Sequence, residues 1–160
     1  MIRIGHGYDV HALIDGEGLR LGGVDIPFDR AFQAHSDGDV AIHALCDALL
    51  GALALGDIGV LYPDSDPTHA NRNSVEFLQE VVGLIHDRNY GIGNVDITVI
   101  AQAPKLRPYI DAMRAVLAST LQVSIECVNV KATTTEGLGP MGRKEGIAAH
   151  AVALLIKDRT

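Results

Sequence analysis

The chain has 160 residues, 48% of them hydrophobic and 21% charged, with a formal net charge of -7. This balance predicts one ordinary globular domain spanning residues 1–160, and the negative charge argues against a general nucleic-acid-binding protein. No apolar run is long enough to cross a membrane, and the two cysteines form no CxxC pair. The N-terminus has no hydrophobic signal core, so we expect a cytoplasmic protein in a reducing compartment, with neither a membrane nor nucleic acid as partner.

The first half of the chain predicts short β-structures followed by a long helix. Residues 2–11 have the pattern of a strand, and residues 19–28 that of a β-hairpin. A helix is expected from about 36 to 55. Either Ser36 or Asp37 could cap it, because both side chains can accept a hydrogen bond from the first turn.

The second half alternates helices and strands. Glycine, proline and aspartate punctuate residues 56–73 and predict a long loop, of the kind that is often functional. We expect helices over 74–89 and 107–121, strands over 94–102, 127–133 and 147–157, and a glycine-rich turn over 137–142. This order indicates an α+β fold, an α/β sandwich in which helices pack on one face of a mixed β-sheet.

The run Asp9-Val10-His11 is a candidate metal site. Residues i and i+2 of a strand point to the same side, so Asp9 and His11 can present a carboxylate oxygen and an imidazole nitrogen to one point. His43, on the expected helix, would complete the three protein ligands of a catalytic zinc ion with an open fourth position. Asp39 or Asp47, one helical turn from His43, could accept the second imidazole N–H.

Three other segments could contact phosphates. His35 and Ser36 precede a helix N-terminus, whose free N–H groups favour anions, although simple helix capping explains them equally well. Residues 131–136 place a lysine, three threonines and Glu136 at a strand end, where phosphates and a divalent cation could bind. Residues 101–107 form a basic loop that could read a base edge or be an ordinary connection.

Seven motifs, in order along the chain, resemble those of the 2-C-methyl-D-erythritol 2,4-cyclodiphosphate synthase family of the non-mevalonate isoprenoid pathway. The resemblance runs nearly end to end, and the length is similar to that of the single-function enzymes without a cytidylyltransferase domain. The motifs are residues 5–11, 35–41, 57–59, 62–66, 101–105, 131–136 and 142–143.

The resemblance implies a phosphorus–oxygen lyase. Family members convert 4-diphosphocytidyl-2-C-methyl-D-erythritol 2-phosphate into the 2,4-cyclodiphosphate and CMP, by attack of the 2-phosphate on the β-phosphorus. The implied zinc ligands are Asp9, His11 and His43, with a substrate phosphate oxygen in the fourth position. The implied ligand of a second divalent cation, magnesium or manganese, is Glu136. Two cations can stabilise both the attacking and the leaving oxygen.

The resemblance also implies catalytic and substrate-binding residues. His35 and Thr134 are expected to support the transition state by hydrogen bonding. The methylerythritol phosphate is expected to contact Ser36, Asp57, Ile58, Gly59, Tyr62, Pro63, Asp64, Ser65 and Asp66. The cytidine diphosphate is expected to contact Ala101, Gln102, Ala103, Pro104, Lys105, Leu106, Arg107, Thr133, Thr134, Thr135 and Glu136. The expected substrate contacts also include Asp9, Val10, His11, His35 and Arg143.

The family resemblance implies a homotrimer with active sites between subunits. The metal triad would come from one chain and the cytidine pocket mostly from the next. In some members a cavity on the threefold axis is associated with isoprenoid diphosphates, and Arg143 matches its phosphate-binding residue. This chain has Pro140-Met141 where many members have Phe-Thr, and Lys144 where glycine is frequent.

Two other functions fit parts of the pattern. The first is a zinc-dependent phosphoester hydrolase, because a zinc ion with an open position can activate water. The second is a non-catalytic trimer that binds isoprenoid diphosphates through Arg143. The product formed from the substrate distinguishes the cyclase from the hydrolase, and binding that survives His43→Ala would indicate the non-catalytic trimer.

Overall fold

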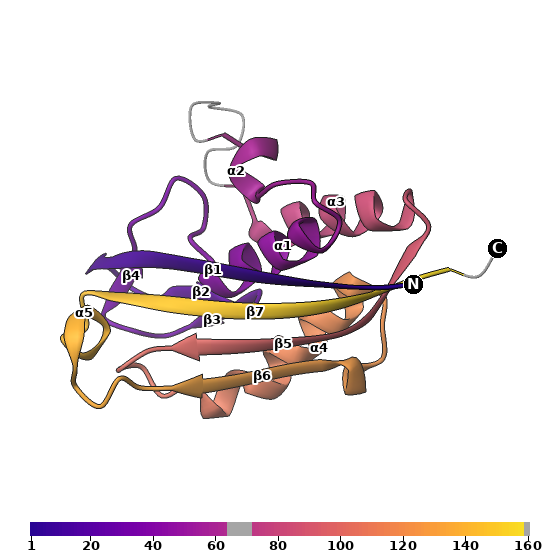
Figure 1. Ribbon diagram of the computed structural model, residues 1–160. Coiled ribbons are helices and arrows are strands. Elements are labelled where there is room, and N and C mark those ends of the chain that lie inside the picture. The colour runs from indigo at the N-terminus through magenta and orange to yellow at the C-terminus, as the bar shows by residue number, and fades with distance from the viewer. Residues whose placement is uncertain (64–71, 159–160) are drawn as a thin grey trace.

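The computed structural model describes residues 1–63 and 72–158, which form a mixed β-sheet with helices on one face (Figure 1). The strands are β1 (Ile2–Asp15), β2 (Leu19–Leu21), β3 (Val24–Ile26), β4 (Arg30–Phe32), β5 (Tyr90–Ile100), β6 (Val128–Thr133) and β7 (Gly146–Lys157). The helices are α1 (Val40–Ala52), α2 (Ile58–Leu61), α3 (Ser74–His86), α4 (Ile110–Leu121) and α5 (Gly139–Gly142), with short 3-10 turns η2 (Arg107–Tyr109) and η3 (Ile125–Cys127).

The main sheet has the strand order β4-β1-β7-β5-β6. All neighbouring pairs are antiparallel except β5 and β6, which run parallel, and β2 and β3 form a separate hairpin. Helix α1 packs on the inner strands β1 and β7, and α4 packs against β6 (Figure 1). The expected α+β class, with helices on one face of a mixed sheet, is confirmed.

Glycines on β1 let helix α1 approach the sheet closely. A Cβ atom added to Gly5 would lie 1.8 Å from the carbonyl oxygen of Ala48, and one added to Gly7 would lie 1.8 Å from that of Ala44. Only a residue without a side chain fits such a contact. Because side chains alternate along a strand, Asp9 continues the face of β1 that turns toward α1.

The opposite face of the sheet carries apolar side chains that no helix of the described chain covers. Ile2 and Ile4 are 63% and 66% exposed, and Ile2 pairs across the strands with the exposed Ile156. Tyr8 and Val152 are also exposed on these strands. We call this surface, formed by Ile2, Ile4, Tyr8, Val152 and Ile156, the open sheet face.

The expected cap of the first helix was wrong. The N-cap of α1 is Asp39, whose carboxylate accepts a hydrogen bond from the backbone N–H of Ile42 at 3.1 Å. Gly38 adopts a φ of +71°, which is incompatible with a right-handed helix, so Ser36 and Asp37 remain outside α1.

The expected ends of several other elements also differ from the structure. The loop over 56–73 contains α2, because the Asp57 side chain accepts a hydrogen bond from the N–H of Val60 and caps a short helical turn. The turn over 137–142 contains α5, and the helix expected from 107 begins as the 3-10 turn η2. Strands β1 and β5 are longer than expected because their paired backbone extends beyond the regular apolar alternation.

Candidate metal centre and active site

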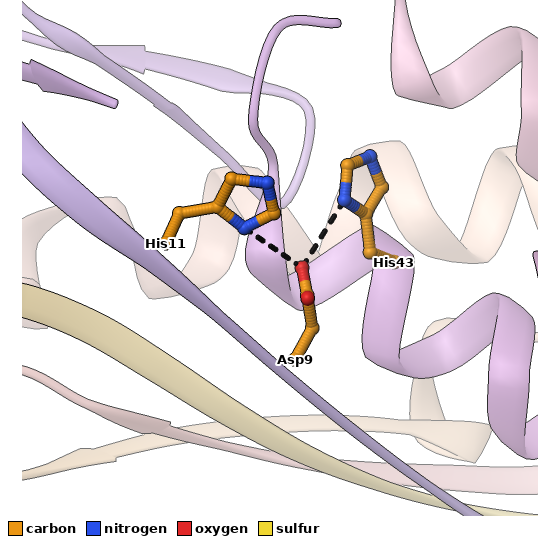
Figure 2. Close-up of side chains that lie close together, drawn as sticks. All are labelled: Asp9, His11 and His43. Atoms are coloured by element: carbon orange, nitrogen blue, oxygen red, sulfur yellow. Dashed lines mark hydrogen bonds and ion pairs between the residues drawn. The ribbon is translucent and has the colours of Figure 1, made fainter. Parts of the chain in front are cut away.

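Strand β1 and helix α1 bring the three expected metal ligands together (Figure 2). Asp9 and His11 lie on β1, on the face toward α1, and His43 lies in the first turns of α1. The Oδ2 atom of Asp9 is 3.0 Å from Nδ1 of His11 and 3.1 Å from Nδ1 of His43. One ligand atom from each residue lies within 4.8 Å of the others, so the three can contact a common ion.

The hydrogen bonding of His11 shows that this arrangement fits a metal. Its Nδ1 atom is buried and has no hydrogen-bond partner, although Asp9 is only 3.0 Å away. A buried ring nitrogen without a partner is costly, and an ion at the point where the three ligand atoms converge would satisfy it. One carboxylate oxygen and two imidazole nitrogens form a donor set suited to a divalent transition metal.

The charges of the triad support each other. Burial acts to raise the pKa of Asp9, but contacts with His11 and His43 outweigh it and lower the pKa to about 2. Burial acts to lower the pKa of His43, but the hydrogen bond and negative charge of Asp9 outweigh it and raise the pKa. The carboxylate therefore stays ionised and available as a ligand over the whole physiological pH range.

The expected acceptors of the second His43 N–H were wrong. The buried carboxylate of Asp39 accepts backbone hydrogen bonds from Gly22 and Gly23, and that of Asp47 accepts one from Ile58. Each carboxylate thus accepts hydrogen bonds from backbone N–H groups that would otherwise lack a partner, rather than from His43. The Nε2 atom of His43 instead lies 2.8 Å from the hydroxyl oxygen of Ser74, the first residue of α3.

A pocket of about 720 Å³ opens beside the triad. Its lining residues are Asp9, Val10, His11, Gln33, Ala34, His35, Ser36, His43, Ile58, Gly59, Tyr62 and Phe77. The pocket therefore brings the triad together with the segments expected to hold the methylerythritol phosphate. The expected contacts Asp64, Ser65 and Asp66 lie outside the described residues, and Asp57 and Pro63 do not line this pocket.

The residues expected to bind cytidine diphosphate form a second group at the ends of β5 and β6. We call residues 101–107 and 133–136 the β5–β6 end cluster. The N–H of Ala101 donates to the carbonyl of Thr133 at 2.9 Å, which joins its two segments. Thr134 and Glu136 are exposed, and the N–H of Glu136 donates to Oγ1 of Thr134 at 3.1 Å.

The β5–β6 end cluster lies far from the triad within one chain. Strands β1 and β6 are separated by β7 and β5, which at ordinary strand spacing places them about 14 Å apart. No residue of the cluster lines the pocket beside the triad. One metal ion cannot contact both Glu136 and the triad, because metal–ligand bonds are much shorter than that separation.

Comparison with known proteins identifies the family. The family model described as "YgbB family" matches residues 2–156. The chain belongs to the YgbB family. A relative from Thioalkalivibrio sulfidiphilus is 66% identical over 96% of both chains, and one from Mannheimia succiniciproducens is 62% identical over 99% of both. Both YgbB relatives are named 2-C-methyl-D-erythritol 2,4-cyclodiphosphate synthase, so the resemblance read from the seven motifs is confirmed.

Solved structures of YgbB relatives have the same fold. The bifunctional IspDF of Campylobacter jejuni gives a TM-score of 0.94 at 45% identity, over 98% of this chain and 42% of that one. The IspF of Plasmodium falciparum in complex with CDP gives a TM-score of 0.88 at 40% identity, over 99% of this chain and 97% of that one. The described residues contain no helix with the length and apolar character of a membrane span.

The structure adds three lining residues to the pocket that the sequence did not mark, and it gives two basic side chains acidic partners. Gln33, Ala34 and Phe77 line the pocket, and nothing in their local sequence marks them. Two basic side chains in the segments considered for phosphate binding have acidic partners. Lys131 bonds to Asp96 at 2.5 and 2.6 Å, and Arg143 pairs with Glu145 at 3.1 Å.

Proposed function

We propose that this chain is a cytoplasmic, single-domain cyclase that converts 4-diphosphocytidyl-2-C-methyl-D-erythritol 2-phosphate into the 2,4-cyclodiphosphate and CMP. The convergence of Asp9, His11 and His43 beside a pocket is the observation that carries the proposal. The name shared by relatives at 62% and 66% identity supports the same reaction. The step requires alignment and charge neutralisation, with no covalent bond between substrate and protein.

The triad would hold zinc, with one ligand position open toward the pocket. Two imidazole nitrogens and one carboxylate oxygen are a common ligand set for catalytic zinc. A bound zinc ion would act as a Lewis acid and neutralise charge on a phosphate of the substrate. Asp9, His11 and His43 orient that phosphate because the strand and the helix hold all three side chains in place.

The remaining residues are proposed to bind and align the substrate. His35, Ser36 and Tyr62 line the pocket beside the triad, which supports contact with the methylerythritol phosphate end. His35 and Thr134 would donate hydrogen bonds to phosphoryl oxygens in the transition state. Glu136 would hold the second divalent cation, magnesium or manganese, between the α- and β-phosphates.

A homotrimer would bring the two groups of residues together. Because about 14 Å separates strands β1 and β6, the triad of one chain needs the β5–β6 end cluster of another to surround one diphosphate. The open sheet face supports assembly, since contiguous exposed apolar patches mark interaction surfaces. Light scattering on purified protein should give a trimeric mass, and Ile4→Glu should reduce it to that of the monomer.

The activity test uses the purified protein with substrate, zinc and magnesium. Chromatography should show CMP, and mass spectrometry should show the cyclic product. The linear product, heavier by one water molecule, would identify a hydrolase instead. His86→Ala, which removes an exposed histidine from the last turn of α3, is the matched control for His43→Ala and should keep full activity.

Mixed trimers test the shared site. Chains with His11→Ala and chains with Thr134→Ala should each be inactive alone, because each lacks one part of every site. After subunit exchange, some sites combine an intact triad with an intact end cluster, so part of the activity should return. Exchange without recovered activity would show that each site is built within one chain.

A further inference from the structure

Ser74 connects the triad to a carboxylate that has no contact with the metal position. It is the first residue of α3 and is completely buried. Its hydroxyl oxygen lies 2.8 Å from Nε2 of His43, and its O–H donates to Oδ1 of Asp37. The backbone N–H of Ser74 also donates to Oδ2 of Asp37, at 2.8 Å.

The direction of these hydrogen bonds follows from the groups involved. A carboxylate can only accept, so the single O–H of Ser74 must point to Asp37. The Ser74 oxygen can then only accept from His43, which places a proton on Nε2 of that imidazole. In a neutral imidazole with Nε2 protonated, Nδ1 carries a lone pair, and Nδ1 is the atom that faces Asp9 and the metal position.

Asp37 is itself held in place. Its Oδ1 atom accepts a second hydrogen bond, from the N–H of Asp39 at 3.2 Å, and Nε of Arg20 lies 3.8 Å from its Oδ2 atom. The other hydroxyl near His43, that of Ser36, is 3.4 Å from Nε2 and is therefore the weaker partner. The hydrogen bond of Nε2 with Ser74 is therefore shorter than that with Ser36, and Asp37 holds the Ser74 hydroxyl in place.

Such a connection is needed because Asp9 favours the wrong tautomer. Its carboxylate lies 3.1 Å from Nδ1 of His43 and attracts a proton to that atom, where a proton would block metal binding. An acceptor at Nε2 opposes this preference. From this geometry we propose that Asp37 and Ser74 are positioning residues, which keep the proton of His43 on Nε2 and leave Nδ1 free for the metal.

This inference rests on the metal site of the proposed function and is tested by metal affinity. In Ser74→Ala the dissociation constant for zinc, measured by chelator competition, should rise about 10- to 100-fold, the usual cost of losing a partner of a metal-bound histidine. Asp37→Asn should weaken zinc binding similarly, because an amide replaces one of its two acceptor oxygens with a donor. Ser74→Thr keeps the hydroxyl and should restore most of the affinity.

Asn73→Ala is the matched control. The Asn73 side chain caps the same helix by accepting from the N–H of Val75 at 2.9 Å, and it makes no hydrogen bond to His43. This variant should lower the melting temperature and leave zinc affinity unchanged. Nitrogen-15 NMR on folded, zinc-loaded protein should show a proton on Nε2 of His43, in slower exchange with water in the wild type than in Ser74→Ala.

The outcomes separate this inference from the proposed function. Zinc binding by the wild type with equal affinity in Ser74→Ala would overturn the positioning role and leave the metal site intact. Equal weakening in Asn73→Ala and Ser74→Ala would also overturn it, because helix stability would then explain both. A wild type that binds no zinc would overturn the metal-dependent function together with the positioning role.

Discussion

The triad and the β5–β6 end cluster differ in how completely one chain builds them. The triad is assembled between the inner strand β1 and the buried helix α1, and His43 is only 9% exposed. In the end cluster, Thr134 and Glu136 are exposed and lie outside the pocket. One half of the proposed site is therefore organised by the core of the chain, whereas the other is organised by backbone turns and is exposed.

The strongest test of the buried half is His43→Ala. Loss of one of three ligands should abolish stoichiometric zinc and lower kcat by about 1000-fold, because metal-ion catalysis contributes several kcal/mol. Metal analysis and the CMP assay measure the two effects. Circular dichroism should remain that of a folded protein, and a variant that keeps stoichiometric zinc would contradict the ligand assignment.

The exposed half should respond differently to Glu136→Gln. We expect about a 100-fold loss of kcat in magnesium, the size of effect seen when one electrostatic contact to a transition state is removed. Because Glu136 is exposed, the free energy of unfolding should change by less than about 0.5 kcal/mol. Zinc content should stay the same. A parallel loss of zinc would erase the distinction between the two halves.

Gly7→Ala should damage the buried half through packing alone. The new Cβ would lie 1.8 Å from the carbonyl oxygen of Ala44, so α1 must shift, at a cost of about 1–3 kcal/mol. Zinc affinity should fall with it, because α1 carries His43. The control is Gly83→Ala in α3, where nothing lies within 4 Å of the added Cβ and helix propensity predicts slight stabilisation. Denaturant unfolding measures both variants.

The buried half should also show a pH dependence of stability, which requires no substitution. Burial raises the pKa of Asp39 from 3.8 to about 6, despite its hydrogen bonds from Gly22 and Gly23. Between these values the folded chain binds more protons than the unfolded chain, so this group makes stability fall as pH rises from about 4 to 6. Carbon-13 NMR of the Asp39 carboxyl in zinc-free protein should show a midpoint near pH 6. A midpoint near 4 would contradict the burial argument.

The sequence predicted the parts of the site that depend on local periodicity. Asp9 and His11 share a face because they are two residues apart on a strand, and His43 was recognisable on an amphipathic helix. The sheet class followed from the order of the elements. The family motifs then connected these residues to a reaction that their spacing alone would not reveal.

The parts that the sequence did not predict depend on contacts distant along the chain. Ser74 was visible only as the start of a helix, and its contact with His43 requires the packing of α3 beside α1. Asp39 caps α1 through Ile42 and also accepts hydrogen bonds from the distant Gly22 and Gly23. The residues next to Ser74 and Asp39 in the sequence do not reveal these distant contacts.

The glycines of β1 also fix the register of that strand. A slip of one residue against β7 would turn Asp9 and His11 to the open sheet face and place side chains such as Ile4 beneath α1. There a Cβ atom would lie 1.8 Å from a helix carbonyl, so the slipped pairing cannot close. The same two small residues thus exclude the misaligned fold that would leave a helix histidine without its metal-binding partners.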